Sequence, residues 1–263
     1  MLLILTLCVA AFLAGLVDSM VGGGGLIQLP VMLILLPSTP IATLLGTNKF
    51  VAITGTSMAA FQYARRIQIR WRTVLPMSAA AFVFSMIGAR VVTGMQPEQL
   101  RPAIIVLLTA IAIYIFANKQ FGADTAAKAT PPWQRWAGLA AGAAIGFYDG
   151  FFGPGTGSFL IFILVSLFGM NFISASGSAK VVNVATNAAA LIYFAATGHI
   201  LFSLALPMAA CNILGAVTGS RLAIDRGNRL LRTLFLVVVS AMIVKLCYDT
   251  FQSQPNLLTW LHL

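Results

Sequence analysis

The stretch GLVDSMVGGGG at residues 15–25 decides the fold, together with its counterpart GFYDGFFGPGTGS at residues 146–158. A shift of 131 positions, without a gap, places Asp18 on Asp149 and Lys49 on Lys180. Between residues 10 and 116, 24 of the 107 pairs matched in this way are identical. The chain is therefore an internal duplication, and charged residues within apolar sequence were duplicated with it.

The composition excludes a soluble globular protein. Hydrophobic residues make up 59% of the chain and charged residues only 8%, with a mean hydropathy of +0.94. A soluble domain carries about a quarter charged residues, so this chain has too little polar surface to face water. The net charge of +10 does not indicate nucleic acid, because the arginines cluster in short loops between apolar segments, as topology determinants do. The expected environment is a lipid bilayer, crossed several times.

Each half of the duplication contains four apolar blocks of membrane-spanning length. The first repeat, residues 1–117, has blocks at 2–37, 41–63, 73–94 and 99–117. The second repeat, residues 135–250, has blocks at 135–169, 173–196, 200–223 and 230–250. A polar linker, 118–134, separates the repeats, and a short tail, 251–263, follows them.

The first block of each repeat is interrupted by glycines. Glycine costs about 1 kcal/mol relative to alanine inside a helix, so four in succession predict a break at residues 22–25. We expect a helix, an unwound turn and a short second helix beginning near Leu26, and near Phe159 in the other repeat. If this hairpin is re-entrant, the two repeats are inverted in the membrane; if it crosses, they are parallel.

The basic residues discriminate between these topologies through the positive-inside rule. In the inverted arrangement two of them, Arg90 and Arg101, fall on one face, and eleven fall on the other: Arg65, Arg66, Arg70, Arg72, Lys119, Lys128, Arg135, Arg221, Arg226, Arg229 and Arg232. The parallel arrangement divides them seven against six. The sequence therefore predicts an all-α polytopic membrane protein with two inverted repeats, each a glycine-broken hairpin plus three spanning helices.

The glycine turns and the two intramembrane lysines are the candidates for binding a ligand. Unwound backbone within a membrane is tolerated where it lines a cavity, and the free amides and positive dipole of a helix N-terminus attract anions. Lys49 and Lys180 lie roughly 12 Å into their helices, where a charge is costly unless it has a function or reaches the interface. The predicted anion-binding residues are Gly22, Gly23, Gly24, Gly25, Thr47, Asn48, Lys49, Gly153, Gly155, Thr156, Ser158, Ser178 and Lys180.

Asp18 and Asp149 have two interpretations that the spacing leaves open. They are either structural partners that neutralise the buried lysines or titrating carboxylates that couple proton movement to transport. No metal site, cofactor motif or nucleotide-binding loop is expected, and no nucleophile–base pair suggests an enzyme.

The paired turns and the downstream elements Gly46-Thr47-Asn48-Lys49 and Gly177-Ser178-Ala179-Lys180 resemble the repeated motifs of the TauE/SafE sulfite exporter family. The resemblance covers essentially the whole chain and places Asp18, Asp149, Lys49 and Lys180 on recurrent motif positions. It implies a multi-pass transporter of small anions, such as sulfite, sulfonates or organic acids, in the bacterial inner membrane. Ala179 stands opposite Asn48, so the two half-sites are not chemically equivalent.

The function expected is therefore secondary transport, and in particular export, of a small anion. An anion channel is the alternative, since it would use the same lysines and glycine turns. An intramembrane enzyme or assembly factor is the weakest class. The expected partners are the bilayer and the anion, and the sequence is compatible with a homo-oligomer.

Overall fold

The computed structural model describes residues 2–95 and 133–253, with only the helical backbone described beyond Gly227. Every regular element in these residues is an α-helix: α1 (Leu2–Val21), α2 (Gly25–Leu35), α3 (Ile41–Arg66), α4 (Trp71–Gly94), α6 (Trp133–Phe151), α7 (Thr156–Ser166), α8 (Phe172–Ala196) and α9 (Phe202–Ser253). The predicted block at 99–117, most of the linker and most of the tail lie outside the described residues.

The helices follow the predicted apolar blocks, and both predicted glycine breaks are confirmed. The short helices begin earlier than expected, at Gly25 and Thr156 rather than near Leu26 and Phe159. The breaks are shorter because only Gly22 in the first, and Gly153 and Gly155 in the second, have left-handed backbone angles. In α9 a further left-handed glycine, Gly227, separates the predicted blocks 200–223 and 230–250.

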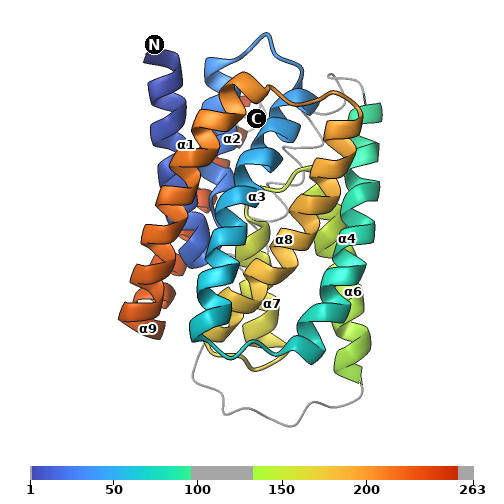
Figure 1. The fold of residues 1–263 in the computed structure, drawn as a ribbon, viewed down its shortest axis with the longest axis vertical. Helices are drawn as coiled ribbons and strands as arrows, with labels where there is room; N and C mark the ends of the chain where they lie inside the picture. Colours follow the sequence, from blue (N-terminus) through green and yellow to red (C-terminus); the bar gives the residue numbers. More distant parts are fainter. Residues whose placement is uncertain (1, 96–132, 254–263) are drawn as a thin grey trace, which may run out of the picture.

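Helices at matched positions of the two repeats run in opposite directions in Figure 1. Along the chain α1, α3 and the first part of α9 run downward in that view, whereas α4, α6 and α8 run upward. The short helix α2 returns to the end at which α1 begins, and α7 returns to the end at which α6 begins. A hydrogen bond of 3.0 Å from the side chain of Gln134 to the carbonyl of Leu167 joins the two ends of the second hairpin.

Each hairpin packs against a helix of the other repeat through glycines. A Cβ added to Gly15 of α1 would lie 2.2 Å from the carbonyl oxygen of Asn212 in α9. The matched glycine of α6, Gly146, is as close to α4, at 2.3 Å from the carbonyl oxygen of Ala81. Such distances allow no side chain, so the backbones touch, as in membrane helix pairs with small interfacial residues.

The described helices have the length and hydropathy of a multi-pass membrane protein. Four spans meet both criteria within the described residues: α1, α4, α8 and the Phe202–Gly227 part of α9. Their outer surfaces carry large exposed apolar side chains, among them Leu75, Leu206 and Leu214. Each short helix instead packs one face inside the protein, α2 in one hydrophobic cluster and α7 in another, and the residues of the turns at 22–24 and 154–157 are buried. The glycine turns therefore lie inside the protein.

Candidate functional site

The two glycine turns touch each other. A Cβ added to Gly22, which has a φ of 81°, would lie 2.2 Å from the carbonyl carbon of Gly157. A Cβ added to Gly157 would lie 2.4 Å from the Cα of Gly22. Any other residue at Gly22 or Gly157 would displace backbone atoms, so the contact between the turns requires glycine at both positions.

Backbone amides at these turns are available as donors. Within the described residues, no hydrogen bond is formed by the amides of Gly23, Gly24 and Gly25, or by those of Gly155, Gly157 and Ser158. Buried amides are normally paired, so such a cluster is unusual. It lies at the N-termini of α2 and α7, where the helix dipoles favour an anion.

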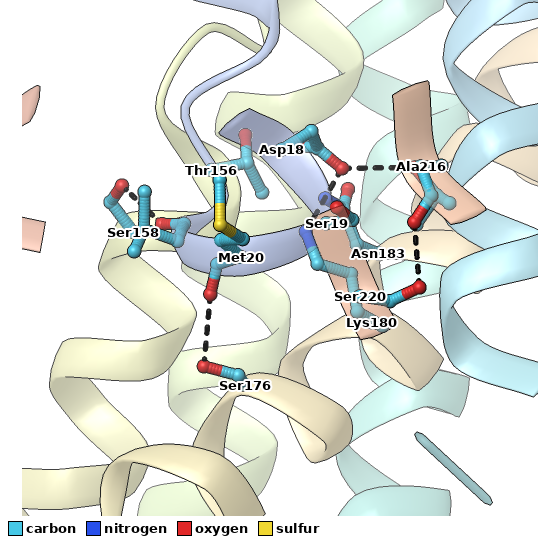
Figure 2. Close-up of polar contacts among 12 residues, drawn as sticks. Asp18, Ser19, Met20, Thr156, Ser158, Ser176, Lys180, Asn183, Ala216 and Ser220 are labelled. Atoms are coloured by element: carbon cyan, nitrogen blue, oxygen red, sulfur yellow. Dashed lines mark hydrogen bonds and ion pairs between the residues drawn. The ribbon is translucent and has the colours of Figure 1, made fainter. Parts of the chain in front are cut away.

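Two ion pairs connect the repeats beside the turns. The ammonium of Lys49 on α3 lies 2.7 Å from Asp149 Oδ2 on α6, and the ammonium of Lys180 on α8 lies 2.9 Å from Asp18 Oδ2 on α1. The lysine side chains are only 3% and 0% exposed, respectively, so neither extends to the protein surface. Figure 2 shows the side chain of Lys180 extending toward Asp18 of α1. Each aspartate therefore contacts the lysine of the other repeat.

The ammonium of Lys49 also reaches the second glycine turn. It lies 2.8 Å from the position that a Cβ would take on Gly153, next to the carbonyl of Asp149. This places a positive charge at the C-terminal end of α6, where the helix dipole is negative. A side chain on Gly153 would displace the ammonium, and the residue's φ of 97° also favours glycine.

Hydroxyl groups from three helices bind the C-terminal end of α1. Tyr63 of α3 donates to the carbonyl of Ser19 at 3.1 Å. The hydroxyls of Ser176 of α8 and Ser158 of α7 donate to the next two carbonyls, those of Met20 and Val21, at 3.2 and 2.8 Å (Figure 2). These carbonyls have no partner within the helix, so the hydroxyls satisfy them and fix the end of α1.

Among the described residues, no hydroxyl of another helix donates to the end of α6. The residues matched to Tyr63, Ser158 and Ser176 are Phe194, Ile27 and Leu45, none of which can donate. The hydroxyl groups of Thr156 and Tyr148 instead bond within their own turn, to the carbonyls of Gly153 and Pro154. The first turn is thus attached by two hydroxyls of the opposite repeat and by Tyr63 of its own repeat, whereas the second is held mainly by itself.

The two ion pairs also differ in their surroundings. Asp18 is 18% exposed and accepts a second hydrogen bond, at 3.3 Å, from the hydroxyl of Thr56. Asp149 is only 2% exposed. The residue matched to Thr56 is Asn187, whose amide bonds to Asn183 rather than to an aspartate. The Asp18–Lys180 pair is therefore the more accessible half of the site.

Not every predicted residue joins the turns. Thr47 donates to the carbonyl of Thr43 at 2.7 Å and accepts from the amide of Leu201 at 3.0 Å, so its hydroxyl supports the loop between α8 and α9. Asn48 and Ser178 are buried, and the hydroxyl of Ser178 has no hydrogen-bond partner among the described residues.

Three polar residues of the site were missed from the sequence: Thr56, Tyr63 and Ser176. Their contacts have no counterpart in the other repeat, so the duplication does not reveal them. Helical spacing could have done so. Thr56 and Tyr63 follow Lys49 at intervals of seven residues, and Ser176 precedes Lys180 by four, which places them on the lysine faces of α3 and α8.

Comparison with known proteins agrees with this architecture. The family model described as Sulfite exporter TauE/SafE matches residues 7–246. The "Probable membrane transporter protein ORF9" of a Sinorhizobium species is 36% identical over 244 residues, covering 92% of both chains. The "Probable membrane transporter protein YfcA" of Escherichia coli K12 is 34% identical over 264 residues, covering 99% of this chain and 94% of that one.

A third relative, the "Probable membrane transporter protein" of Haemophilus influenzae, is 33% identical over 248 residues, covering 94% of this chain and 95% of that one. No solved structure gives a significant match. The family match over nearly the whole chain, the three full-length relatives and the apolar helices lead to one assignment. The chain is a multi-pass membrane transporter and belongs to the TauE/SafE sulfite exporter family.

Proposed function

We propose that this chain is a secondary transporter that exports a small anion, such as sulfite, a sulfonate or another sulfur-containing or organic acid, across the bacterial inner membrane. Its two repeats are inverted, and the anion binds where the glycine turns of α1–α2 and α6–α7 meet. The opposite directions of the matched helices support the inverted arrangement.

One observation carries the proposal: the contact of Gly22 with Gly157 lies beside two buried lysines and a cluster of unpaired amides. Broken helices of two repeats that meet inside the protein are a recurrent design for binding sites in transporters. Amides at helix N-termini and ammonium groups are the donors that bind oxyanions. The described residues around the turns thus offer donors from both repeats to one small ligand.

The charge of the aspartates determines how strongly the site attracts an anion. While both carboxylates are ionised, the four charges of the two pairs sum to zero, so the site gives a bound anion little electrostatic stabilisation. When a proton neutralises Asp18, the ammonium of Lys180 loses its counter-charge and becomes available to the anion. Asp18 is the better candidate because it is the more exposed of the two aspartates. Removal of the Asp18 charge is therefore expected to leave anion affinity at least as high as in the wild type.

Two arguments support an oxyanion and outward transport. The family is described as a sulfite exporter, and the donors at the turns suit a small oxygen-bearing anion. The inside-negative membrane potential also favours the outward movement of any anion.

Transport by purified protein in liposomes tests the proposal against the channel alternative. Liposomes with equal sulfite concentrations on both sides are given a pH gradient, and sulfite on each side is then measured. A transporter coupled through Asp18 accumulates sulfite on one side, and the Asp18→Asn variant does not. Rapid exchange of sulfite without net accumulation, in both proteins, would contradict coupled transport and favour a channel. The measurement is repeated with thiosulfate, methanesulfonate and acetate to find the substrate class.

A further inference from the structure

A groove separate from the glycine turns lies between α3 and α9. Its volume is about 440 Å³, and its walls are Met58, Phe61, Gln62, Arg65, Arg66, Val217 and Arg221. Arg65 and Arg66 are in the last turn of α3, so the groove lies at the end of the helix bundle, where a spanning helix meets the membrane surface.

The groove gathers guanidinium groups with little acidic compensation. Arg66 lies 3.6 Å from Asp225, but these side chains are 59% and 65% exposed, and such pairs contribute little. Within the described residues, Arg65 and Arg221 form no salt bridge, and Arg65 stacks over the ring of Phe61 at 5.4 Å. Two guanidiniums that face one groove therefore form no ion pair with any carboxylate in the described part of the chain.

The rim of the groove is apolar and exposed. Phe61 is 56% exposed, and on α9 Leu214 and Leu222 are 61% and 38% exposed. Leu214, Val217 and Arg221 recur at intervals of three and four residues, so they lie along one face of α9. The guanidiniums thus lie at the edge of an apolar surface of the kind that faces lipid in this class of protein.

We infer that this groove binds the phosphate headgroup of an anionic phospholipid. The chemistry required is that of a tetrahedral oxyanion attached to an apolar body. Arg65, Arg221 and the amide of Gln62 would hold the oxygens, and Phe61 and Leu214 would contact the acyl chains. Arginine suits this role because its planar fork pairs with phosphate through two hydrogen bonds. Basic pockets between membrane helices are known to select anionic headgroups.

The groove is independent of the central site. None of its lining residues contributes a hydrogen bond or ion pair to the aspartates, the lysines or the glycine turns among the described residues. Loss of lipid binding and loss of anion binding are therefore expected in different variants, and one can fail without the other.

Thermal unfolding in a non-ionic detergent tests the inference. Dioleoylphosphatidylglycerol, which carries one negative charge, is titrated against dioleoylphosphatidylcholine, which has the same acyl chains and no net charge. The groove variant is Arg65→Gln/Arg221→Gln. The control is Arg72→Gln/Arg90→Gln, which removes the same charge from two exposed positions on α4. Each variant is first shown to be monodisperse and to unfold cooperatively without lipid.

The anionic lipid is expected to raise the unfolding temperature saturably, the zwitterionic lipid is not, and the groove variant is expected to need at least tenfold more lipid. The control variant should match the wild type. Equal effects of both lipids, or equal losses in both variants, would overturn the inference. A saturable shift with inorganic phosphate alone, abolished in the groove variant, would assign the groove to a free oxyanion and overturn the lipid assignment.

Discussion

Buried charges at the centre of the molecule are stabilised by reciprocal pairing between the repeats. Lys49 reaches Asp149, and Lys180 reaches Asp18. Removing one partner of a buried pair typically costs about 3–5 kcal/mol, because an uncompensated charge remains. The two pairs therefore connect α3 to α6 and α8 to α1 as well as providing the charges of the site. A variant that neutralises a lysine alone would affect the structural pairing and the charge of the site together, so it would not separate these two roles.

The positions of the four charged residues were predictable from the duplication, but their pairing was not. Each aspartate precedes the lysine of its own repeat by 31 residues, and this spacing does not show which lysine it contacts. Only the packing of α3 against the second glycine turn, and of α8 against α1, selects the reciprocal partners. The role of Tyr63 was equally hidden, since its matched residue, Phe194, has the same shape without the hydroxyl.

The hydroxyl of Tyr63 gives a prediction at this scale. Tyr63→Phe is expected to lower the free energy of unfolding by about 1–3 kcal/mol, because the buried carbonyl of Ser19 loses its donor. Tyr193→Phe is the matched control, since that partly exposed hydroxyl accepts a bond from the side chain of Thr93 and serves no helix end. Denaturant unfolding in detergent measures both, and equal losses would contradict the capping role.

At the scale of elements, the two broken helices were predictable because glycine is costly in a helix. Their starting points were not, since the left-handed angles are confined to Gly22, Gly153 and Gly155, and helical geometry resumes sooner than composition suggests. The sequence also did not indicate that the two helix ends at the breaks are held by different hydrogen bonds. The end of α1 is fixed by hydroxyls from three other helices, whereas the end of α6 bonds mainly within its own turn.

The contact between the turns predicts a severe effect of Gly22→Ala. The new methyl would lie 2.2 Å from backbone of Gly157, and alanine would be strained at a φ of 81°. We expect destabilisation of about 2–5 kcal/mol and loss of anion binding. Gly94→Ala is the control, because a Cβ there meets no atom within 4 Å. Thermal unfolding measures both variants, and equal unfolding temperatures would contradict the contact between the turns.

At the scale of the whole molecule, the charge asymmetry of the sequence corresponds to a feature of the fold. The loops that follow α3 and α7 lie at the same end of the molecule in Figure 1, where Arg70 donates to the carbonyl of Phe168 at 3.1 Å. Arg90 belongs to the other end of α4. Composition thus predicted the all-helical membrane architecture, since it depends on solvent and lipid rather than on side-chain detail, whereas the inverted topology derived from the positive-inside rule stays a prediction.

Labelling of the matched loops tests the inverted topology. Single cysteines at Gln68 and His199, in a background without Cys8, Cys211 and Cys247, are exposed to a membrane-impermeant thiol reagent in sealed inverted and right-side-out vesicles. The two positions should react in opposite vesicle types, because the α3–α4 and α8–α9 loops lie at opposite ends of the bundle. Reaction of both positions from the same side would contradict inversion.

The lysines are proposed to bind the anion as well as to pair with the aspartates. The direct measurement is calorimetric anion affinity of Asp18→Asn compared with Asp18→Asn/Lys180→Met, in detergent, using whichever of sulfite, thiosulfate, methanesulfonate or acetate stabilises the wild type most. Both variants avoid an unpaired buried carboxylate. Asp18→Asn should bind at least as tightly as the wild type, because Lys180 is already free. The double variant should bind at least tenfold more weakly than the single variant, because a charge-assisted contact contributes about 1.5–3 kcal/mol. Equal affinity of the two variants would contradict the claim.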